Sequence, residues 1–313
     1  MLEKMTWEER MPGEIETIDG QEFRIQRLMG QGGMAKVYEA IDPNGKKVAL
    51  KIYFAASARQ WQLIKHAHET RRKYPEIPRQ LLIHPIFSGL SGKAVCDLVE
   101  GDTAKEQAKN LLNVTNAIRS ARDLVLKTVP TLDLLAQKGL VHRDIKGSNL
   151  QLVPDADHAT LLDIDLLTEI DHPLNHDGGI WGSKLYLSPE QCTNHAGNKT
   201  DMFGLAATVT FDYMEEEIGH IVDIGESGMS PDQLMYQRVN STSTANPDTQ
   251  NRLLDLDRYP EEVRDEAYGL LMFIIAALQP GPKDRPANST VVKQLLVCGR
   301  NATMFAGPAV LPN

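Results

Sequence analysis

One segment, LVHRDIKGSNL at residues 140–150, constrains this chain more than any other stretch of its sequence. It places a carboxylate, an ammonium group and a carboxamide on one short loop, at Asp144, Lys146 and Asn149. These groups can accept a proton, offset negative charge and offer an oxygen ligand to a cation. A polar turn between two apolar runs would also contain polar residues, but seldom this set at this spacing.

The segment resembles the catalytic loop of the protein-kinase family, HRDxKxxN, with every position matched from His142 and Arg143 onward. The resemblance implies that Asp144 orients an acceptor hydroxyl and takes its proton. It also implies that Lys146 offsets charge on the moving γ-phosphoryl group and that Asn149 helps to hold Mg²⁺.

Composition limits the class of protein. A chain of 313 residues suits one large fold or two lobes, and 42% hydrophobic residues predict a full globular core. The net charge of -9 disfavours general binding to nucleic acid or to anionic membrane. The three cysteines, Cys96, Cys192 and Cys298, show no CxxC spacing, which indicates reduced thiols and a cytoplasmic protein.

Neither end of the chain predicts a membrane segment. The start, MLEKMTWEERMPGEIE, has no apolar core of a signal peptide, although an exported effector without such a signal stays open. The apolar run Tyr268–Leu278 is too short to span a bilayer and is typical of a buried helix. We expect the tail after Gly299 to be a coil or a loosely docked strand.

From Phe23 the pattern predicts two strands, a turn at Pro43–Gly45 and a third strand. The first turn carries three glycines: Gly30, Gly32 and Gly33. A backbone without side chains can close over phosphates, although a plain hairpin turn needs glycine too.

The family resemblance extends to this hairpin through the pattern GxGxxGxV, in which Val37 matches. Lys51, at the end of VALK, matches the strand lysine that grips the α and β phosphates. Ala35 stands where the third glycine is usual, so we expect a stiffer loop.

Residues 55–74 have helical spacing of apolar residues. The resemblance implies that Glu69, the only acid between Lys51 and Pro75, pairs with Lys51. Lys73 stands where the family usually has an apolar residue. A shifted helix with Glu69 facing solvent is therefore the alternative.

Two further strands are predicted in LLIHPIFSGL and KAVCDLVEG. The resemblance implies an adenine-binding hinge at Asp97, Leu98 and Val99. A position of the hinge shifted by one or two residues is the alternative. Cys96 would then limit the back of the adenine pocket.

Residues 103–138 predict a short polar helix followed by a longer amphipathic one. Pro130 predicts a kink or a break in the second helix, and Gly139 predicts its C-terminal cap. After Asn149 the sequence predicts a hairpin of short strands that ends at Asp163.

Asp163-Ile164-Asp165 stands where the family has Asp-Phe-Gly, so the resemblance implies that Asp163 is a metal ligand. Asp165 is the alternative ligand. It also replaces the glycine that gives this segment its freedom to flip.

The segment Thr168–Tyr186 corresponds to the family's activation loop. Only two hydroxyl residues, Thr168 and Ser183, precede the tyrosine, which favours constitutive activity or control by a partner. Gly182, Ser183 and Tyr186 match the substrate-facing GTxxY pattern.

Two further anchors follow from the resemblance. Glu190, in Ser188-Pro189-Glu190, is expected to pair with Arg285. Asp201 resembles the acid at a helix start that supports the catalytic loop, although an acid there also favours the helix dipole.

The resemblance covers residues 23–296 and implies an α+β, two-lobed kinase fold. One lobe would be a small antiparallel β-sheet with one main helix, and the other would be larger and mainly helical. We expect an N-terminal extension at 1–22, the small lobe at 23–99, the large lobe at 100–298 and a tail at 299–313.

The chain is similar to bacterial eukaryotic-like serine/threonine kinases, which implies ATP and Mg²⁺ as cofactors and a protein hydroxyl as acceptor, possible self-modification included. Two other functions remain open. Asp165, Ala35 and the helix around Glu69 favour a pseudokinase scaffold that binds nucleotide or a partner. A kinase of small molecules on the same fold is disfavoured by the peptide-facing segment GSKLYLSPE.

Overall fold

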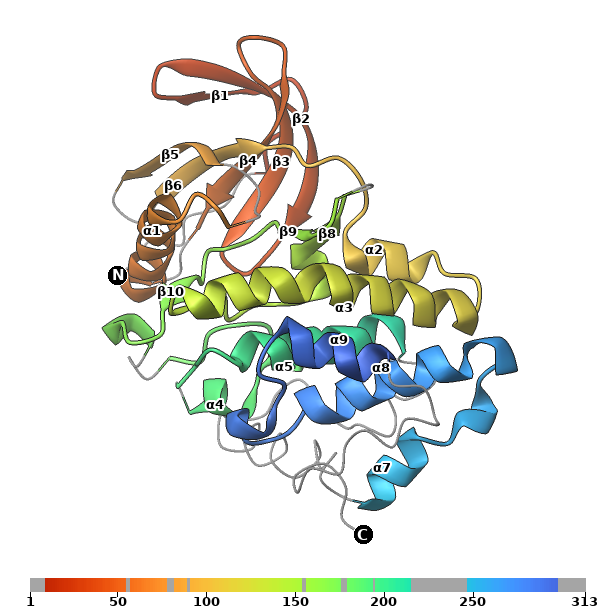
Figure 1. Cartoon of the computed structure of the whole chain (residues 1–313). Coiled ribbons are helices and arrows are strands. Elements are labelled where there is room, and N and C mark those ends of the chain that lie inside the picture. The colour runs from red at the N-terminus through yellow and green to blue at the C-terminus, as the bar shows by residue number, and fades with distance from the viewer. Residues whose placement is uncertain are drawn as a thin grey trace. The chain divides into compact units, whose positions relative to one another are not determined.

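Alternating apolar and polar residues form one antiparallel sheet in the computed structural model (Figure 1). In β2 (Gln21–Gln31), Phe23 and Ile25 are buried and their neighbours are exposed, so one face of the strand contacts the core. The strand order is β1-β2-β3-β4-β6-β5. The other strands are β1 (Ile15–Ile18), β3 (Ala35–Ile41), β4 (Lys47–Tyr53), β5 (Leu82–Ser88) and β6 (Ser91–Asp97).

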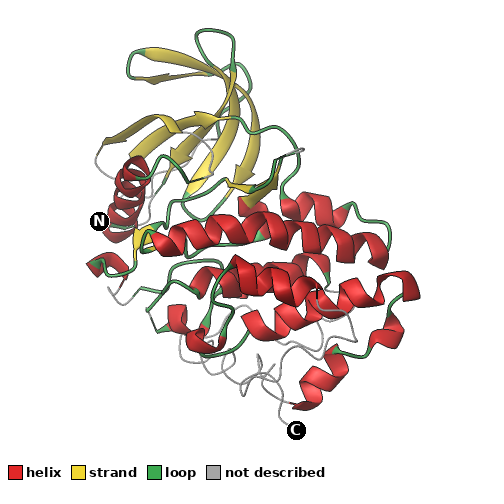
Figure 2. Cartoon of the chain, viewed as in Figure 1, coloured by secondary structure: helices red, strands yellow, loops and turns green. Residues whose placement is uncertain are grey.

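The structure describes residues 9–54, 57–77, 82–88, 91–153, 156–175, 179–193, 195–214 and 247–297. The chain forms two compact units, each described below by itself. The sheet unit contains Met1–His68 and Arg79–Glu100, and the helical unit contains Glu69–Pro78 and Gly101–Asn313. Figure 2 shows the difference in secondary structure between them. Cys298 and the tail expected at 299–313 lie outside the described residues.

The predicted hairpin and its turn are confirmed in the sheet unit. The Asp42 carboxylate accepts hydrogen bonds from the backbone N–H groups of Asn44 and Lys46, at 2.9 and 2.7 Å. Gly45 has a positive φ of 82° and donates its N–H to the Asp42 carbonyl. This Asx-type turn joins β3 to β4 because glycine adopts positive φ at little cost.

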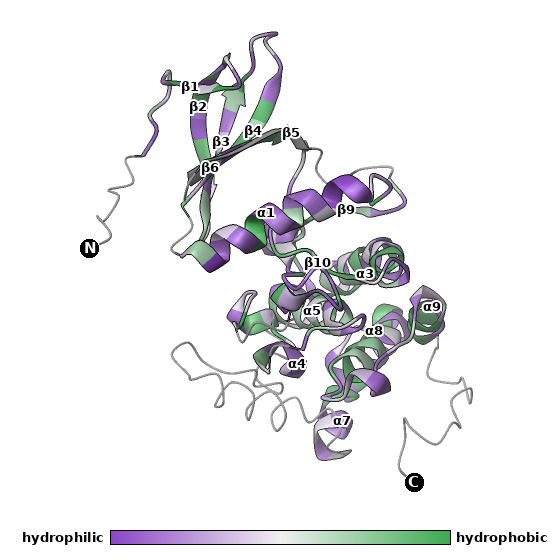
Figure 3. Ribbon diagram, turned by 90° about the vertical axis from the view of Figure 1, so that its left-hand side faces the viewer, coloured by the Kyte–Doolittle hydropathy of each residue, from purple (hydrophilic) through white to green (hydrophobic). Residues whose placement is uncertain are grey.

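The predicted helix is α1 (Ala58–Lys73), which begins in the sheet unit and ends in the helical unit. Trp61 and Ile64 are one turn apart and pack with Tyr53 of β4. The Tyr53 hydroxyl and the His68 Nε2 atom are 2.9 Å apart, so a polar contact adds to this apolar one. Figure 3 shows that most of α1 is coloured as hydrophilic residues.

The helical unit is built around α3 (Val114–Gln137), which contacts α5, α8 and α9. Its buried residues recur at helical intervals, Ile118, Ala121 and Val125 among them. Figure 3 shows α8 as a largely hydrophobic helix, which agrees with the burial of most of its residues. The other helices are α2 (Ala104–Lys109), α4 (Pro189–Cys192), α5 (Thr200–Thr208), α7 (Pro247–Leu253), α8 (Arg264–Ala277) and α9 (Ser289–Val297).

Short elements complete the helical unit. Two strand pairs are β7 (Leu140–Val141) with β10 (Thr168–Glu169), and β8 (Leu150–Leu152) with β9 (Ala159–Leu161). The second pair confirms the hairpin predicted after Asn149. Single helical turns lie at Gly147–Asn149, Pro173–Asn175, Lys184–Tyr186, Leu256–Arg258, Glu261–Val263 and Pro282–Asp284, and a π-helix lies at Val209–Tyr213.

Of the predicted kink or break at Pro130, the break is wrong, because α3 continues through this residue, and the kink stays a prediction. Proline removes one backbone N–H, but Val129 and Thr131 beside it are buried. Packing on both sides therefore holds the helix together. The predicted cap at Gly139 is confirmed: it has a φ of 66° and donates its N–H to the Ala136 carbonyl at 3.0 Å. No helix among the described residues is long and apolar enough to cross a membrane.

Candidate active site

The polar loop at residues 142–149 is fixed at both ends by short strands of the helical unit. β7 precedes the loop and pairs with β10, and β8 follows it and pairs with β9. The Leu162 N–H donates to the Asn149 carbonyl at 3.0 Å. These pairings bring the end of the loop next to the turn that carries Asp163 and Asp165.

Asp201 anchors the start of the loop from the first turn of α5. Its two carboxylate oxygens accept the backbone N–H groups of His142 and Arg143, at 2.7 and 2.9 Å. Arg143 has a φ of 69°, which residues other than glycine rarely adopt, so this anchor stabilises an unfavourable backbone conformation. Burial raises the pKa of the Asp201 carboxyl. The predicted support of the loop by Asp201 is confirmed.

The Asp144 carboxylate lies at the centre of the loop and accepts three hydrogen bonds. Oδ2 receives the Lys146 ammonium at 2.8 Å and the Asn149 amide at 3.0 Å. Oδ1 receives the Ser183 backbone N–H at 2.9 Å. Burial alone would raise the pKa of Asp144, but the charge of Lys146 and these hydrogen bonds hold that pKa below its ordinary value. The carboxylate is therefore ionised and directed by fixed donors.

Lys146 connects this carboxylate to the segment Thr168–Tyr186, called the activation segment below. Its ammonium group donates to Asp144 and also to the Ser183 hydroxyl, at 2.6 Å. The side chain is 22% exposed, so the cation can still meet an incoming anion. A carboxylate, a cation and a hydroxyl thus lie within one hydrogen-bonded group.

Asn149 and Asp163 each offer oxygen atoms of the kind that a hard cation prefers. The Asn149 amide nitrogen donates to the carbonyl and to the carboxylate of Asp144, which directs its oxygen elsewhere. Asp163 accepts the Asp165 backbone N–H at 3.1 Å and is partly exposed, whereas Asp165 is buried. Within the described ranges no three His, Cys, Asp or Glu residues form a metal cluster. Two protein oxygens fit Mg²⁺, which keeps waters and binds substrate phosphates.

The end of the activation segment contacts the loop closely at Gly182. This residue has a φ of 127°, and a Cβ atom there would lie 2.6 Å from the Arg143 carbonyl oxygen. Only glycine fits this contact. It places Ser183 against Asp144, while the Tyr186 hydroxyl donates to Asp212 at 2.9 Å.

Glu190 and Arg285 form the predicted ion pair, which is confirmed as a bidentate one. Nη1 and Nη2 of Arg285 lie 2.6 and 2.9 Å from the two oxygens of Glu190. The Arg285 side chain is fully buried and stacks on the Phe203 ring, 4.9 Å from its centroid. Burial alone would raise the pKa of Glu190, but Arg285 holds it below the ordinary value.

The unusual Lys73 has a partner in the helical unit. Its ammonium group lies 3.1 Å from one Glu169 oxygen, and the Thr70 hydroxyl donates to the other at 3.2 Å. The last turn of α1 is thereby tied to β10. Glu69 is exposed on the same helix. Lys51 and Glu69 belong to different units, so their pairing stays a prediction.

The other residues predicted to bind nucleotide lie in or beside the sheet. Gly30 of β2 pairs with Val37 of β3, and Val37 pairs in turn with Lys51 of β4. The Lys51 ammonium lies 5.3 Å from the Tyr53 ring centroid. Gly32 donates its N–H to the Ala35 carbonyl at 2.9 Å, and Gly33 follows in the same turn. Asp97 ends β6 and pairs with Lys46, and the partly buried Val99 follows it.

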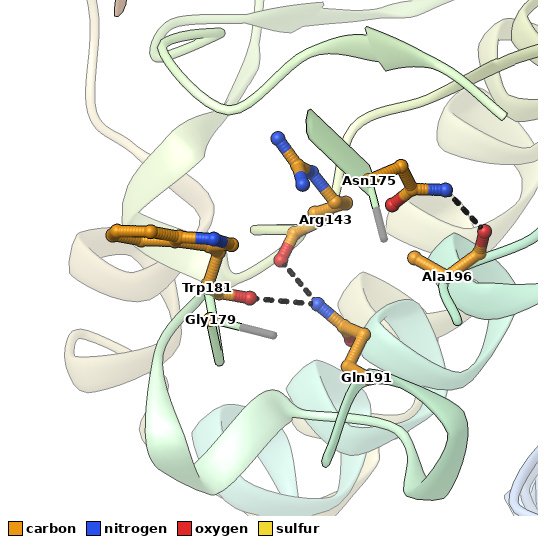
Figure 4. A pocket seen from close by; sticks show the side chains of 6 residues that line it. All are labelled: Arg143, Asn175, Gly179, Trp181, Gln191 and Ala196. Carbon is orange, nitrogen blue, oxygen red and sulfur yellow. Dashed lines mark hydrogen bonds between the residues drawn. The ribbon is translucent and has the colours of Figure 1, made fainter. Parts of the chain in front are cut away.

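Sequence reasoning missed Gln191, which follows Glu190 and is buried. Its amide donates to the carbonyls of Arg143 and Trp181 (Figure 4). The signal was present as Ser188-x-x-Gln191, which is the pattern of a capping box. A small pocket of about 160 Å³ lies beside these groups, lined by Arg143, Asn175, Gly179, Trp181, Gln191 and Ala196.

Comparison with known proteins decides which family this site belongs to. Residues 23–297 match the family described as protein kinase domain. The chain belongs to the protein kinase family. Membership implies ATP as the phosphoryl donor and, typically, a divalent metal ion. The expected kinase fold and the resemblance to bacterial eukaryotic-like serine/threonine kinases are both confirmed.

The chain is similar to two curated serine/threonine-protein kinases. It is 27% identical to PknA of Mycobacterium tuberculosis over 205 residues, which is 60% of this chain and 46% of PknA. It is 28% identical to PknL of Mycobacterium bovis over 241 residues, which is 74% of this chain and 57% of PknL. The chain therefore spans about half the length of these relatives.

A solved structure supports the fold of the chain. The crystal structure of the Mycobacterium tuberculosis PknI kinase domain, in a double-mutant form, is similar with a TM-score of 0.58 and 17% sequence identity. The similarity covers 92% of this chain and 98% of that one. At this identity it shows the fold alone.

Proposed function

We propose that this chain is an ATP- and Mg²⁺-dependent serine/threonine protein kinase that transfers the γ-phosphate to protein hydroxyls, its own included. The observation that carries the proposal is the Asp144 carboxylate, which is held by Lys146, Asn149 and the Ser183 amide. Fixed donors around an ionised acid are what a phosphoryl-transfer site needs, because such catalysis consists mainly of positioning and charge stabilisation.

In this proposal each residue of the loop has one role. Asp144 orients the acceptor hydroxyl and takes its proton, and its lowered pKa keeps it ready to accept. Lys146 offsets negative charge at the transferred group. Asn149 and Asp163 would hold Mg²⁺, and bound MgATP would supply the phosphoryl group. The sheet unit would bind the nucleotide through the turn at Gly30, Gly32, Gly33 and Val37, through Lys51, and through the backbone at Asp97 and Val99. Glu69 of the helical unit would pair with Lys51.

The acceptor class follows from two observations. The curated relatives are serine/threonine kinases by name. Ser183, which approaches Lys146 and Asp144, shows that an aliphatic hydroxyl fits beside these groups. We therefore propose serine and threonine of a protein as acceptors.

We also propose that the protein is cytoplasmic. We further propose that nucleic acid is not among its partners. Cys96 and Cys192 are both buried and form no disulfide, which suits a reducing compartment. The formal net charge of -9 disfavours phosphate backbones as ligands. Control by a partner or constitutive activity remains our proposal for regulation, because the activation segment offers few hydroxyl residues.

The transfer reaction is tested by incubating the purified chain with Mg²⁺, ATP labelled at the γ-phosphate and a generic basic protein. We expect label on serine or threonine of the protein or of the chain itself, identified by phosphoamino-acid analysis. Label confined to tyrosine, or to a small molecule, would contradict the proposed acceptor.

The metal assignment needs its own comparison. We expect Asp163→Ala to abolish transfer and to remove the dependence of nucleotide binding on Mg²⁺. Asp165→Ala is the matched variant from the same turn and should retain that dependence. Transfer that survives the first substitution and is lost in the second would place the metal ligand at Asp165.

A further inference from the structure

The carboxamide of Gln191 connects the catalytic loop, the activation segment and α4. Its amide nitrogen donates to the Arg143 carbonyl at 2.8 Å and to the Trp181 carbonyl at 3.0 Å (Figure 4). Its oxygen accepts the N–H and the hydroxyl of Ser188, at 3.0 and 3.3 Å. A carboxamide has two N–H donors and two acceptor lone pairs, so every hydrogen-bonding position of this buried group is occupied.

The contact with Arg143 lies at a sensitive place in the backbone. Arg143 has a φ of 69°, and Asp201 holds its N–H side at 2.9 Å. Gln191 holds its carbonyl side. That carbonyl shares one peptide plane with the N–H of Asp144, so the orientation of this plane decides where the Asp144 side chain begins.

The contact with Trp181 fixes the other side of the same site. Trp181 is followed by Gly182 and Ser183, and the Ser183 N–H donates to the Asp144 carboxylate at 2.9 Å. A Cβ atom at Gly182 would lie 3.2 Å from the Gln191 nitrogen and 2.6 Å from the Arg143 carbonyl, so these groups meet closely. The Gln191 carboxamide therefore holds two backbone segments. One carries the Asp144 carboxylate, and the other carries the Ser183 N–H that donates to it.

We propose that Gln191 is a positioning residue for phosphoryl transfer. It acts through Asp144 and does not touch substrate. The inference rests on the proposed function, because it assigns Gln191 to the same reaction. The two hydrogen bonds that Gln191 donates hold the Asp144 carboxylate and the Ser183 N–H in position relative to each other.

A purely structural role would be to cap α4 through Ser188. The two roles use different atoms of the carboxamide: the oxygen serves the cap, and the nitrogen serves the loop. Gln191→Glu keeps an acceptor for Ser188 but replaces the nitrogen with an oxygen that faces two carbonyls. Ser188→Ala is the matched control, since it removes only the hydroxyl contact and keeps both donated bonds.

The experiment compares kcat, the KM for ATP and the thermal midpoint of the wild type and both variants. We expect Gln191→Glu to lower kcat by about tenfold or more, with the KM for ATP within about twofold of the wild-type value. Ser188→Ala should leave kcat unchanged. Protonation of the carboxylate that Gln191→Glu introduces restores one O–H donor, so the ratio of variant to wild-type kcat should rise as the pH is lowered.

Three outcomes overturn the inference: an unchanged kcat in Gln191→Glu, an equal loss in Ser188→Ala, or a kcat ratio that does not change with pH. If Gln191→Glu does not fold, the neutral, similarly sized Gln191→Met tests the same loss in kcat. Amide hydrogen exchange gives a readout without turnover: exchange at residues 142–149 and 181–186 should rise in the variant. A wild type that transfers no phosphate refutes the proposed function, and unchanged exchange then refutes the positioning role separately.

Discussion

The buried ion pair between Glu190 and Arg285 allows a quantitative prediction about stability. Arg285→Ala removes a fully buried guanidinium and leaves the Glu190 carboxylate with the Thr200 hydroxyl, at 2.8 Å, as its remaining side-chain donor. It also frees the backbone carbonyls of Gln279 and Pro280, which Arg285 bonds at 2.8 and 3.0 Å. Each loss takes from a half-buried acceptor the hydrogen bond that Arg285 donates to it.

Removing one partner of a buried pair destabilises a protein by about 3–5 kcal/mol. For a unit of this size that corresponds to a fall in thermal midpoint of roughly 6–20 °C. The assay is thermal unfolding followed by circular dichroism. Arg119→Ala is the matched control, because its pair with Glu266 has side chains 55% and 32% exposed and should contribute less than about 1 kcal/mol.

The pH dependence gives a second test of the same pair. The pKa of Glu190 in the folded protein is below its ordinary value of 4.5, so its stabilisation is present above that value. The stabilisation is lost as the pH falls through the folded pKa. The difference between the wild type and Arg285→Ala should therefore narrow below about pH 4.5. A midpoint shift as small as that of Arg119→Ala, or one independent of pH, would refute this reasoning.

Three further predictions concern the loop itself. Gly182→Ala should destabilise the folded protein by about 1–3 kcal/mol and reduce transfer, because Gly182 has a positive φ and contacts Arg143. Gly197→Ala is the control: open space surrounds Gly197, so the thermal midpoint and the activity should be nearly unchanged. Asp201→Asn should lower the free energy of unfolding in urea by about 1.5–3 kcal/mol, since an amide cannot accept two backbone N–H groups equally; no change would contradict the anchor. The pKa of Asp144 is below its ordinary value of 3.8, so kcat/KM should show no loss from its protonation between about pH 5 and pH 8; an acid limb in that range that depends on Asp144 would count against this assignment.

Much of the helical unit was predictable because its motifs indicate which residues pair with one another. The pairing of Glu190 with Arg285 and the support of the loop by Asp201 follow from motifs far apart in the sequence, and both are confirmed. The cap at Gly139 follows from local chemistry, since glycine tolerates positive φ. These features depend on residue type more than on packing.

Other features depend on tertiary contacts that a sequence does not display. Pro130 predicted a break, but buried neighbours hold α3 together. Lys73 looked misplaced until Glu169 of β10 was found beside it. β1 (Ile15–Ile18) escaped notice because its burial does not follow hydrophobicity: the polar Glu16 is buried and the apolar Ile15 is exposed. The pattern Ser188-x-x-Gln191 indicates only a helix cap. The contacts of Gln191 with the loop were missed because they go to backbone carbonyls, which have no sequence signature.

In the proposed function, the carboxylate of Asp144 orients the acceptor hydroxyl and takes its proton during phosphoryl transfer. The most direct test measures transfer of labelled γ-phosphate by Asp144→Ala and by Ser148→Ala, an exposed position of the same loop. We expect Asp144→Ala to lose transfer by about 10²-fold or more while it still binds ATP, and Ser148→Ala to remain active. Transfer by Asp144→Ala at the wild-type rate would contradict the claim.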